Sequence, residues 1–422
     1  MHRTPAKTRG TVVLRLSTRF VGPLNCQDTP TRDPPGHVRK LLLNRIGKTM
    51  KSFRAYFFLL IVCILLSACG NVPPVPVTQT SIPTAATAGT SITPIELQSG
   101  YGVRGAWFEL YFTNPASPLS PQGTGGVDGP LVEAIDAARL SVDVAAYSLS
   151  LNSVRNALLR AHDRGATVRV VMESSNMDRS DPERLIEAGI PVIGDNRDGL
   201  MHDKFIIIDK SELWLGSMNF TDGGAYEDNN NLMRIRSTKM AENYMKEFEE
   251  MFLENKFGEE VAPETPHPTL TIDGTRIDTF FSPDDGVLAA LVPVLESARE
   301  SIYFLAYSFT ANQLGEIVRQ KAEADVTVAG VMDDEQVRSN QGTEFDPFRQ
   351  ADLDVRLDGI DGLMHHKVFV VDEQIVVLGS YNFSRSAEER NDENLLIIYD
   401  PVIAEQFIFE FQRVQEQAQR ND

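Results

Sequence analysis

Apolar runs of strand length alternate with amphipathic segments of helical length over most of the chain after about residue 105. In the first part of this region, runs of four to seven apolar residues fit strands, and longer runs with a period near 3.6 fit helices. We expect helices over 131–139 and 153–164 and strands over 141–147, 167–172, 205–208 and 213–215. This alternation predicts an α/β sandwich.

The same order of elements then occurs a second time. The letters DGLMH at 198–202 recur at 361–365, and the offset of 163 also relates Lys204 to Lys367. Upstream the two copies are related by an offset of 160, as in AR at 138–139 and 298–299. The second copy predicts helices over 287–299 and 313–323 and strands over 301–307, 326–332, 368–371 and 375–378.

A Pro-rich linker at 259–270 separates the two copies. We therefore expect two similar α/β sandwich halves, 105–258 and 271–422, related by a pseudo-twofold axis. Such packing brings the two copies of the repeated motif to one shared site. We expect a monomer in which the two halves form an internal pseudo-dimer.

The region before residue 105 has a different character. A basic start at Lys51 and Arg54 leads into an apolar run over 55–66 that is short for a membrane span, and Leu-Ser-Ala-Cys follows at 66–69. We interpret 50–69 as a signal peptide whose end resembles the lipobox of bacterial lipoproteins, with Cys69 as the lipidated residue. An uncleaved anchor or a buried helix is the alternative.

The flanks of this segment support the same interpretation. Residues 1–49 have no clear period, and we interpret them as an upstream extension before a true start at Met50. Residues 70–104 are rich in Pro and Thr and predict an extended tether. Together these features predict an exported protein, anchored to a membrane and facing outside the cytoplasm. The side, the particular membrane and the translation of 1–49 stay open.

The charge of the chain argues against a general electrostatic binder of nucleic acids. It contains 40 Lys and Arg against 59 Asp and Glu, a net charge of -19, and 12 of the 40 basic residues lie before residue 70. A polyanionic partner requires a basic surface, so nucleic acid is disfavoured as a partner. The three cysteines (Cys26, Cys63 and Cys69) all precede the α/β region, which excludes a cysteine metal site or a disulfide framework there.

The repeated motif carries groups suited to phosphodiester chemistry. His202 and Lys204 lie two positions apart near the start of a predicted strand, so their side chains share a face. Ser217 and Asn219 repeat this spacing after the next strand. The second copy supplies the same set as His365, Lys367, Ser380 and Asn382. One imidazole can attack phosphorus and the other can protonate the leaving oxygen, while Lys, Asn and Ser donors hold the phosphoryl oxygens.

The duplicated pattern H-x-K-x-x-x-x-D followed by G-S-x-N resembles the phospholipase D superfamily over roughly residue 105 to the C-terminus. The resemblance implies a bilobal fold with one shared site, a phosphohistidine intermediate and metal-independent cleavage without a cofactor. It also implies an acidic residue after each motif that orients the histidine. Glu393 takes this place in the second half, but Asn230 stands there in the first half, so Asn230, Asp228 and Glu227 are all candidates to orient His202.

We expect Glu393 to partner His365. On that pairing a carboxylate favours a charged His365 as general acid and leaves His202 as the nucleophile. Asp209 and Asp372 follow their histidines by seven positions, and we interpret them as structural residues. A metal site at His365 and His366 is disfavoured, because no His pair has the i, i+4 spacing of a helical site.

Other polar residues near the motifs have a weaker claim to a role. Tyr147 and Tyr307 end strands and line either the pocket or the core. We interpret 333–335 as a solvated acidic loop, and we expect 113–128, 174–184 and 335–348 to form the walls of the site.

The substrate is the least determined feature. Export to a membrane and a negative charge favour a phospholipid over a nucleic acid, and a zwitterionic headgroup over anionic cardiolipin. The expected activity is therefore hydrolysis of phospholipid headgroup esters, with a nuclease or a phosphatidyltransferase of cardiolipin synthase type as alternatives.

Overall fold

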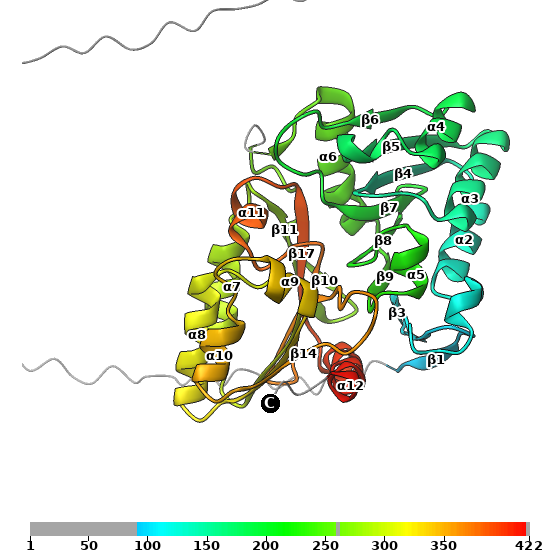
Figure 1. The fold of residues 1–422 in the computed structure, drawn as a ribbon. Coiled ribbons are helices and arrows are strands. Elements are labelled where there is room, and N and C mark those ends of the chain that lie inside the picture. Colours follow the sequence, from blue (N-terminus) through cyan, green and yellow to red (C-terminus); the bar gives the residue numbers. More distant parts are fainter. Residues whose placement is uncertain (1–90, 259–261, 419–422) are drawn as a thin grey trace, which may run out of the picture. The chain divides into compact units, whose positions relative to one another are not determined.

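Two mixed β-sheets, one from each half of the sequence, form the framework of the computed structural model, which describes residues 91–258 and 262–418 (Figure 1). The nine-stranded sheet has the order β1-β2-β3-β9-β8-β7-β4-β5-β6. The eight-stranded sheet has the order β10-β11-β17-β16-β15-β12-β13-β14. The duplicated α/β fold expected from the repeat is confirmed.

The first half runs through β1 (Thr93–Glu96), β2 (Tyr101–Arg104), β3 (Phe108–Phe112), α2 (Asp128–Ala137), β4 (Ser141–Ala146), α3 (Asn152–Asp163), β5 (Thr167–Met172), α4 (Ser180–Glu187), β6 (Val192–Gly194), β7 (Lys204–Ile208), β8 (Glu212–Gly216), α5 (Asp222–Tyr226), β9 (Asn231–Arg236) and α6 (Thr238–Glu254). The second half has a similar order, with one strand fewer at its start and a second helix after β13: β10 (Thr269–Ile272), β11 (Thr275–Ser282), α7 (Val287–Glu296), β12 (Ser301–Ala306), α8 (Asn312–Glu323), β13 (Thr327–Met332), α9 (Asp334–Ser339), α10 (Phe345–Gln350), β14 (Asp354–Leu357), β15 (Lys367–Val371), β16 (Ile375–Gly379), α11 (Arg385–Glu389), β17 (Glu393–Tyr399) and α12 (Pro401–Gln417). The predicted helices and strands agree with these bounds to within three residues.

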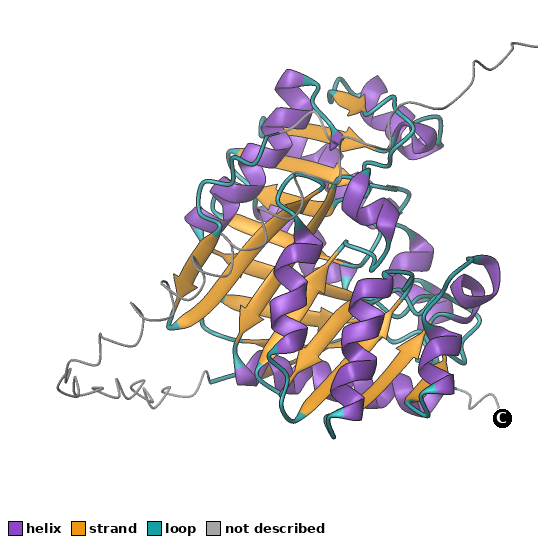
Figure 2. Ribbon diagram, turned by 90° about the vertical axis from the view of Figure 1, so that its left-hand side faces the viewer, coloured by secondary structure: helices purple, strands orange, loops and turns teal. Residues whose placement is uncertain are grey.

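Each sheet is covered by helices on both faces, which explains why its central strands are largely apolar. The outer faces pack against α2 and α3 in the first half and against α7, α8 and α10 in the second (Figure 1). Figure 2 shows the helices that cover the outer face of the second sheet. The inner faces share one core with α6 and α12. There the rings of Tyr244 and Phe281 lie 5.0 Å apart, and those of Phe112 and Phe407 lie 5.1 Å apart, so aromatic contacts join the two halves.

The sheets extend further than the composition predicts at two places. β1 and β2 precede residue 105; β1 pairs with β2, and β2 pairs with β3, although the Pro/Thr-rich pattern predicts a tether up to 104. β10 begins at Thr269, inside the predicted linker, because its backbone pairs with β11. In both places strand pairing with a neighbour decides the structure over local composition.

The expected signal peptide, Cys69, the upstream extension and most of the predicted tether lie outside the described residues. Within the described part of the chain, no helix combines the length and apolar character needed to cross a bilayer.

Candidate active site

The two motif strands start beside the segment that leads into the last strand of the other half. The amide of His202 donates to the Asp392 carbonyl at 3.0 Å, just before β17. The amide of His365 donates to the Asn229 carbonyl at 3.0 Å, just before β9. The two motifs therefore meet at the interface between the halves, and each is held in place by the opposite half.

The orienting contacts of the histidines cross this interface. His202 Nδ1 lies 2.7 Å from Glu393 Oε2, and His365 Nδ1 lies 3.0 Å from Asn230 Oδ1. The expectation that Glu393 partners His365 is therefore wrong, and Asn230 is not the partner of His202. The physical reason is that β9 and β17 each begin beside the motif of the opposite half. The orienting residue at each of these starts therefore contacts the histidine of the other half and not the histidine of its own half.

The two other candidates to orient His202, Asp228 and Glu227, do not contact it in this way. Asp228 accepts the amide of Leu363 at 2.9 Å, and the Glu227 side chain is exposed.

The surroundings of Asn230 determine which ring nitrogen of His365 carries a proton. Asn230 Nδ2 donates to the Gly224 carbonyl at 2.9 Å, so the Oδ1 atom faces the histidine. An oxygen there requires a proton on His365 Nδ1. Burial raises the pKa of Glu393 to about 7, and in its ionised form Glu393 accepts from His202 Nδ1, because a carboxylate has no proton to donate. Both rings therefore have their Nδ1 atoms engaged by these partners.

Ser217 and Ser380 lie behind the orienting residues rather than at the front of the site. The Ser217 hydroxyl donates to Asn230 Oδ1 at 2.8 Å, and both serines are fully buried. Ser380 Oγ accepts the amide of Asn394 at 3.0 Å, and its hydroxyl also hydrogen-bonds to Glu393. These contacts suit a role in holding Asn230 and Glu393, whereas we expected the serines to bind phosphate.

Asn219 and Asn382 have buried side-chain oxygens, and any binding of a phosphoryl oxygen would fall to their Nδ2 donors, because an Oδ1 atom only accepts hydrogen bonds. The Oδ1 atoms of both are buried, and neither has a hydrogen-bond partner in the described part of the chain. Their strands end at Gly216 and Gly379, with φ near +155° and +152°. A Cβ at Gly216 would lie 2.4 Å from the Asn231 carbonyl, so glycine is required where the chain passes this close to β9.

The two lysines are buried beside the histidines. Lys204 Nζ donates to the His202 carbonyl at 2.6 Å and lies 5.1 Å from the ring centre of Tyr147. Lys367 Nζ donates to the His365 carbonyl at 2.7 Å and lies 4.5 Å from the ring centre of Tyr307. Burial lowers the pKa of Lys204 to about 8 and that of Lys367 well below its usual value.

Both histidine pKa values are lowered well below the usual range. Burial is the main cause, and the charges of Lys204 and Lys367 add to it for each ring. Because each lysine acts on the histidine of both halves, the four side chains form one electrostatic unit. The site is poised for an anion, since a negative charge placed there offsets the repulsion.

Tyr147 and Tyr307 contact the catalytic candidates directly, which the sequence left undecided. Their rings lie edge-on to His202 and His365, with centres 4.9 Å and 4.6 Å apart. They are half-buried, so they form walls of the site. Their position at equivalent strand ends of the repeat is the signal that could have identified them.

The motif aspartates have the structural role expected of them. Asp209 accepts the amides of Arg139, Leu140 and Ser141 at 2.7 to 3.1 Å, and Asp372 does the same for Arg299, Glu300 and Ser301. Both also adopt positive φ in the tight turns that follow β7 and β15. They tie each motif strand to the start of its neighbour.

The interpretation of 333–335 as a solvated loop is wrong for Asp333. This residue is 1% exposed, caps α9 through the amide of Gln336, and accepts the amide of Met364 at 3.0 Å. Glu173 holds Met201 in the same way at 3.1 Å. Each carboxylate therefore fixes the residue directly before a motif histidine, a function that only the fold reveals.

A second pair of contacts crosses the interface behind the histidines. Asp203 Oδ1 accepts from Asn394 Nδ2 at 2.6 Å, and Asn231 Nδ2 lies 2.9 Å from His366 Nδ1. His366 Nε2 also contacts Glu410 of α12 at 2.8 Å, so both ring nitrogens of His366 have protein partners.

Within the described residues, no group of three or more His, Cys, Asp or Glu side chains is arranged to hold a metal ion.

Asp203 gives a pH-dependent stability prediction. Its side chain is fully buried, and burial raises its pKa from 3.8 to about 7. The folded state then binds this proton more tightly than the unfolded chain, so the stabilisation is present below about pH 4 and is lost as the pH rises to 7. We expect Asp203→Asn to reduce the fall in Tm that this group causes between about pH 4 and pH 7, measured by thermal unfolding. Asp198→Asn, at an exposed position, is the control, and an unchanged slope in Asp203→Asn would contradict the prediction.

The fold and the crossed His-Lys-Asn sets define a two-lobed α/β protein with one shared site. A family model described as "Cardiolipin synthase, PLD-like domain" matches residues 131–252 and 291–415, more than half of the chain. The chain therefore belongs to this phospholipase D-like family.

Individual relatives agree with this membership. The chain is 33% identical over 137 residues to "Phospholipase D" of Rickettsia prowazekii, covering 32% of this chain and 65% of the relative. It is 34% identical over 133 residues to "Mitochondrial cardiolipin hydrolase" of Homo sapiens, covering 32% of this chain and 52% of that protein. Thus the chain spans less than two thirds of either relative's length. The crystal structure of phosphatidylserine synthase from Haemophilus influenzae shares the fold, with a TM-score of 0.55 and 13% identity over 74% of this chain and 86% of that one.

Proposed function

We propose that this protein is a phosphodiesterase of phospholipase D type that hydrolyses the headgroup ester of a phospholipid. The observation that carries the proposal is the meeting of two histidines and two buried lysines at one interface, each histidine held by a residue of the opposite half. Two imidazoles and a concentrated positive charge suit a reaction that needs a nucleophile, an acid and an anion site.

In the proposed reaction His202 Nε2 attacks phosphorus, and the bond to the headgroup oxygen breaks as that oxygen takes the Nε2 proton of His365. Water then attacks the phosphohistidine and gives a proton to His365, and the P–N bond breaks to restore His202. The sum is a phosphodiester and water converted to a phosphomonoester and an alcohol. Lys204, Lys367, Asn219 and Asn382 would hold the phosphoryl oxygens.

The crossed pairing supports His202 as the nucleophile for a reason different from the one expected. Positive charge develops on the attacking ring as its Nε2 bonds to phosphorus, and the Glu393 carboxylate stabilises that charge. The acid loses charge instead, and a neutral amide at Asn230 leaves it more acidic than a carboxylate would.

The decisive experiment uses phosphatidylcholine vesicles with a primary alcohol and excess chelator, beside single-stranded DNA. We expect hydrolysis together with a transphosphatidylated product, because an alcohol can replace water in the second step and no metal is needed. Cleavage of DNA alone would make the protein a nuclease. Loss of activity in EDTA with recovery on adding zinc or calcium would contradict the mechanism, and transfer without hydrolysis would favour a phosphatidyltransferase.

We also propose that the protein is exported and anchored through Cys69. We expect Cys69→Ser to release or misprocess a chain that is otherwise recovered with membranes, and to abolish labelling by a palmitate analogue. Membrane retention of the parent without any label would favour an uncleaved anchor.

A further inference from the structure

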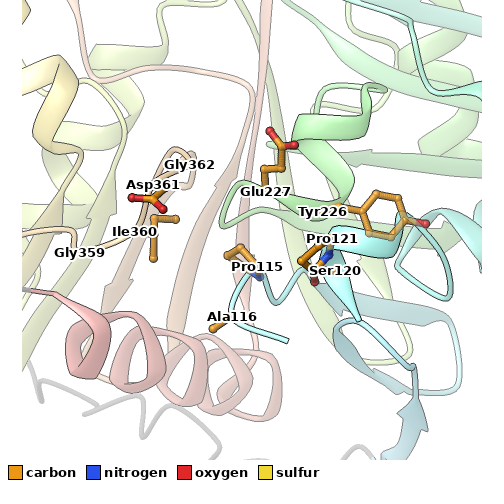
Figure 3. A pocket seen from close by; sticks show the side chains of 10 residues that line it. All are labelled: Pro115, Ala116, Ser120, Pro121, Tyr226, Glu227, Gly359, Ile360, Asp361 and Gly362. Carbon is orange, nitrogen blue, oxygen red and sulfur yellow. The ribbon is translucent and has the colours of Figure 1, made fainter. Parts of the chain in front are cut away.

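The two motif lysines are buried cations without an ion-pair partner. Lys204 and Lys367 are each 1% exposed, and within the described residues the one hydrogen bond that each Nζ atom donates goes to a backbone carbonyl. The open cavity between the halves does not reach them, because neither lysine is among its lining residues (Figure 3). Burial of an ammonium group without water or a carboxylate favours the loss of its proton. Another group is therefore needed to keep these lysines charged.

Each half places a tyrosine ring against its lysine. Lys204 Nζ lies over the ring of Tyr147, 5.1 Å from its centre, and Lys367 Nζ lies over the ring of Tyr307, 4.5 Å from its centre. The face of an aromatic ring attracts a cation, and the attraction is strongest when both groups are withdrawn from water. The contact occurs at equivalent points of both copies of the repeat, so it belongs to the design of the site and not to one side-chain conformation.

The backbone fixes each tyrosine beside its motif. The amide of Tyr147 donates to the carbonyl of Asp203 at 3.0 Å, and the amide of Tyr307 donates to the carbonyl of His366 at 2.8 Å. Each acceptor is the residue between the motif histidine and the motif lysine. A tyrosine anchored there contacts both side chains, which explains why the same ring also lies edge-on to the histidine.

The hydroxyl groups of the two tyrosines have different surroundings. Gln336 Nε2 donates to the Tyr307 hydroxyl at 3.1 Å, whereas the Tyr147 hydroxyl has no hydrogen bond within the part of the chain that the structure describes. The ring position is thus common to both halves and the hydroxyl contact is not. The ring face is the feature that can act on both lysines.

We propose that Tyr147 and Tyr307 are positioning residues whose ring faces hold Lys204 and Lys367 in the charged form that binds the phosphoryl group. The inference rests on the proposed function and assigns these residues a part in it. An ammonium has three N–H donors, and the motif carbonyl takes one, so a ring contact leaves two on each lysine for the phosphoryl oxygens. A carboxylate in the same place would occupy those donors and repel the incoming anion.

Other charges also act on the two lysines, and the test leaves them in place. They come from the other lysine, from both motif histidines, and from the carboxylates of Asp203, Asp228, Asp333 and Glu393. A change in the titration of a lysine after replacement of the tyrosine alone therefore reports the loss of the ring.

The test measures the lysine pKa values by NMR of the ε-carbons in the full chain labelled with ¹³C-lysine, with signals assigned through Lys204→Arg and Lys367→Arg. We expect Tyr147→Leu to lower the pKa of Lys204 by about 1 and to have a smaller effect on Lys367, and Tyr307→Leu to do the reverse. The Phe variants should keep both values within about 0.3 of the parent, since Phe retains the ring face. Tyr303→Leu is the control, because its ring packs on Phe411 of α12.

A second measurement follows the Kd for sulfate, an anion whose charge stays constant over the titration. At about pH 8 each Leu variant should bind sulfate roughly fivefold more weakly than the parent, and each Phe variant within about twofold of it. The two halves provide independent tests, so one variant that does not fold leaves the other.

The outcomes separate this inference from the proposed function. Lysine pKa values that both Leu variants leave unchanged would overturn the role of the rings. Phe variants that match the Leu variants would assign the effect to the hydroxyl and contradict the ring-face account. Neither measurement requires turnover, so a protein that shows the expected lysine titration but hydrolyses no phospholipid would overturn the proposed function and leave the ring contact standing.

Discussion

His365→Asn is expected to accumulate a phosphate adduct on His202 when the substrate carries a nitrophenol leaving group. Such a group needs little protonation, so attack by His202 proceeds without the acid. The second step needs His365 to accept a proton from water, so the adduct then persists. Intact-mass measurement and peptide mapping of the quenched enzyme would locate the phosphoryl group.

His202→Asn is the matched variant and should form no adduct, with hydrolysis reduced by roughly 10⁴-fold or more. An adduct found on His365 would reverse the two roles. The folded state of both variants is checked by thermal unfolding, because each replacement leaves a buried partner, Asn230 or Glu393, without its histidine.

Glu393→Gln is expected to slow turnover by about 10²- to 10³-fold, with a similar loss for nitrophenyl and alkyl leaving groups. The carboxylate contacts His202 at 2.7 Å and stabilises charge that develops during attack, a step common to both substrates. The ratio of the two rates shows which step Glu393 assists, because a group acting on the general acid would slow the alkyl substrate selectively. Thermal unfolding of the variant checks separately that its structure is retained.

Asn230→Asp provides the complementary case. A carboxylate on His365 should raise the pKa of the general acid and weaken it, so the alkyl substrate should lose more activity than the nitrophenyl substrate. If Glu393→Gln instead affected the alkyl substrate selectively, His202 would be the acid and the nucleophile assignment would be wrong.

Much of the fold and the motif residues can be predicted from sequence because they repeat. Identical letters at an offset of 163 place His202 and His365 at equivalent points, and apolar periodicity alone locates the central helices and strands. The role of Asp209 as a turn residue follows from its odd spacing along a strand, since that spacing turns it away from the histidine face. These features depend on the pattern of residues that are close together in the sequence or repeated along it. A single sequence shows such a pattern in full.

Partners across the interface could not be predicted, because pairing by position in the repeat assigns Glu393 to the wrong histidine. Only the packing of the halves brings β17 beside the first motif and β9 beside the second, so that each orienting residue serves the opposite half. The burial of Asp333 is hidden from the sequence for a related reason. Its acidic neighbours predict a solvated loop, and only the fold places its carboxylate against the amide of Met364. The sequence by itself thus determined the elements and the chemistry of each half, and tertiary structure decided which groups meet, because those contacts join residues more than 100 positions apart along the chain.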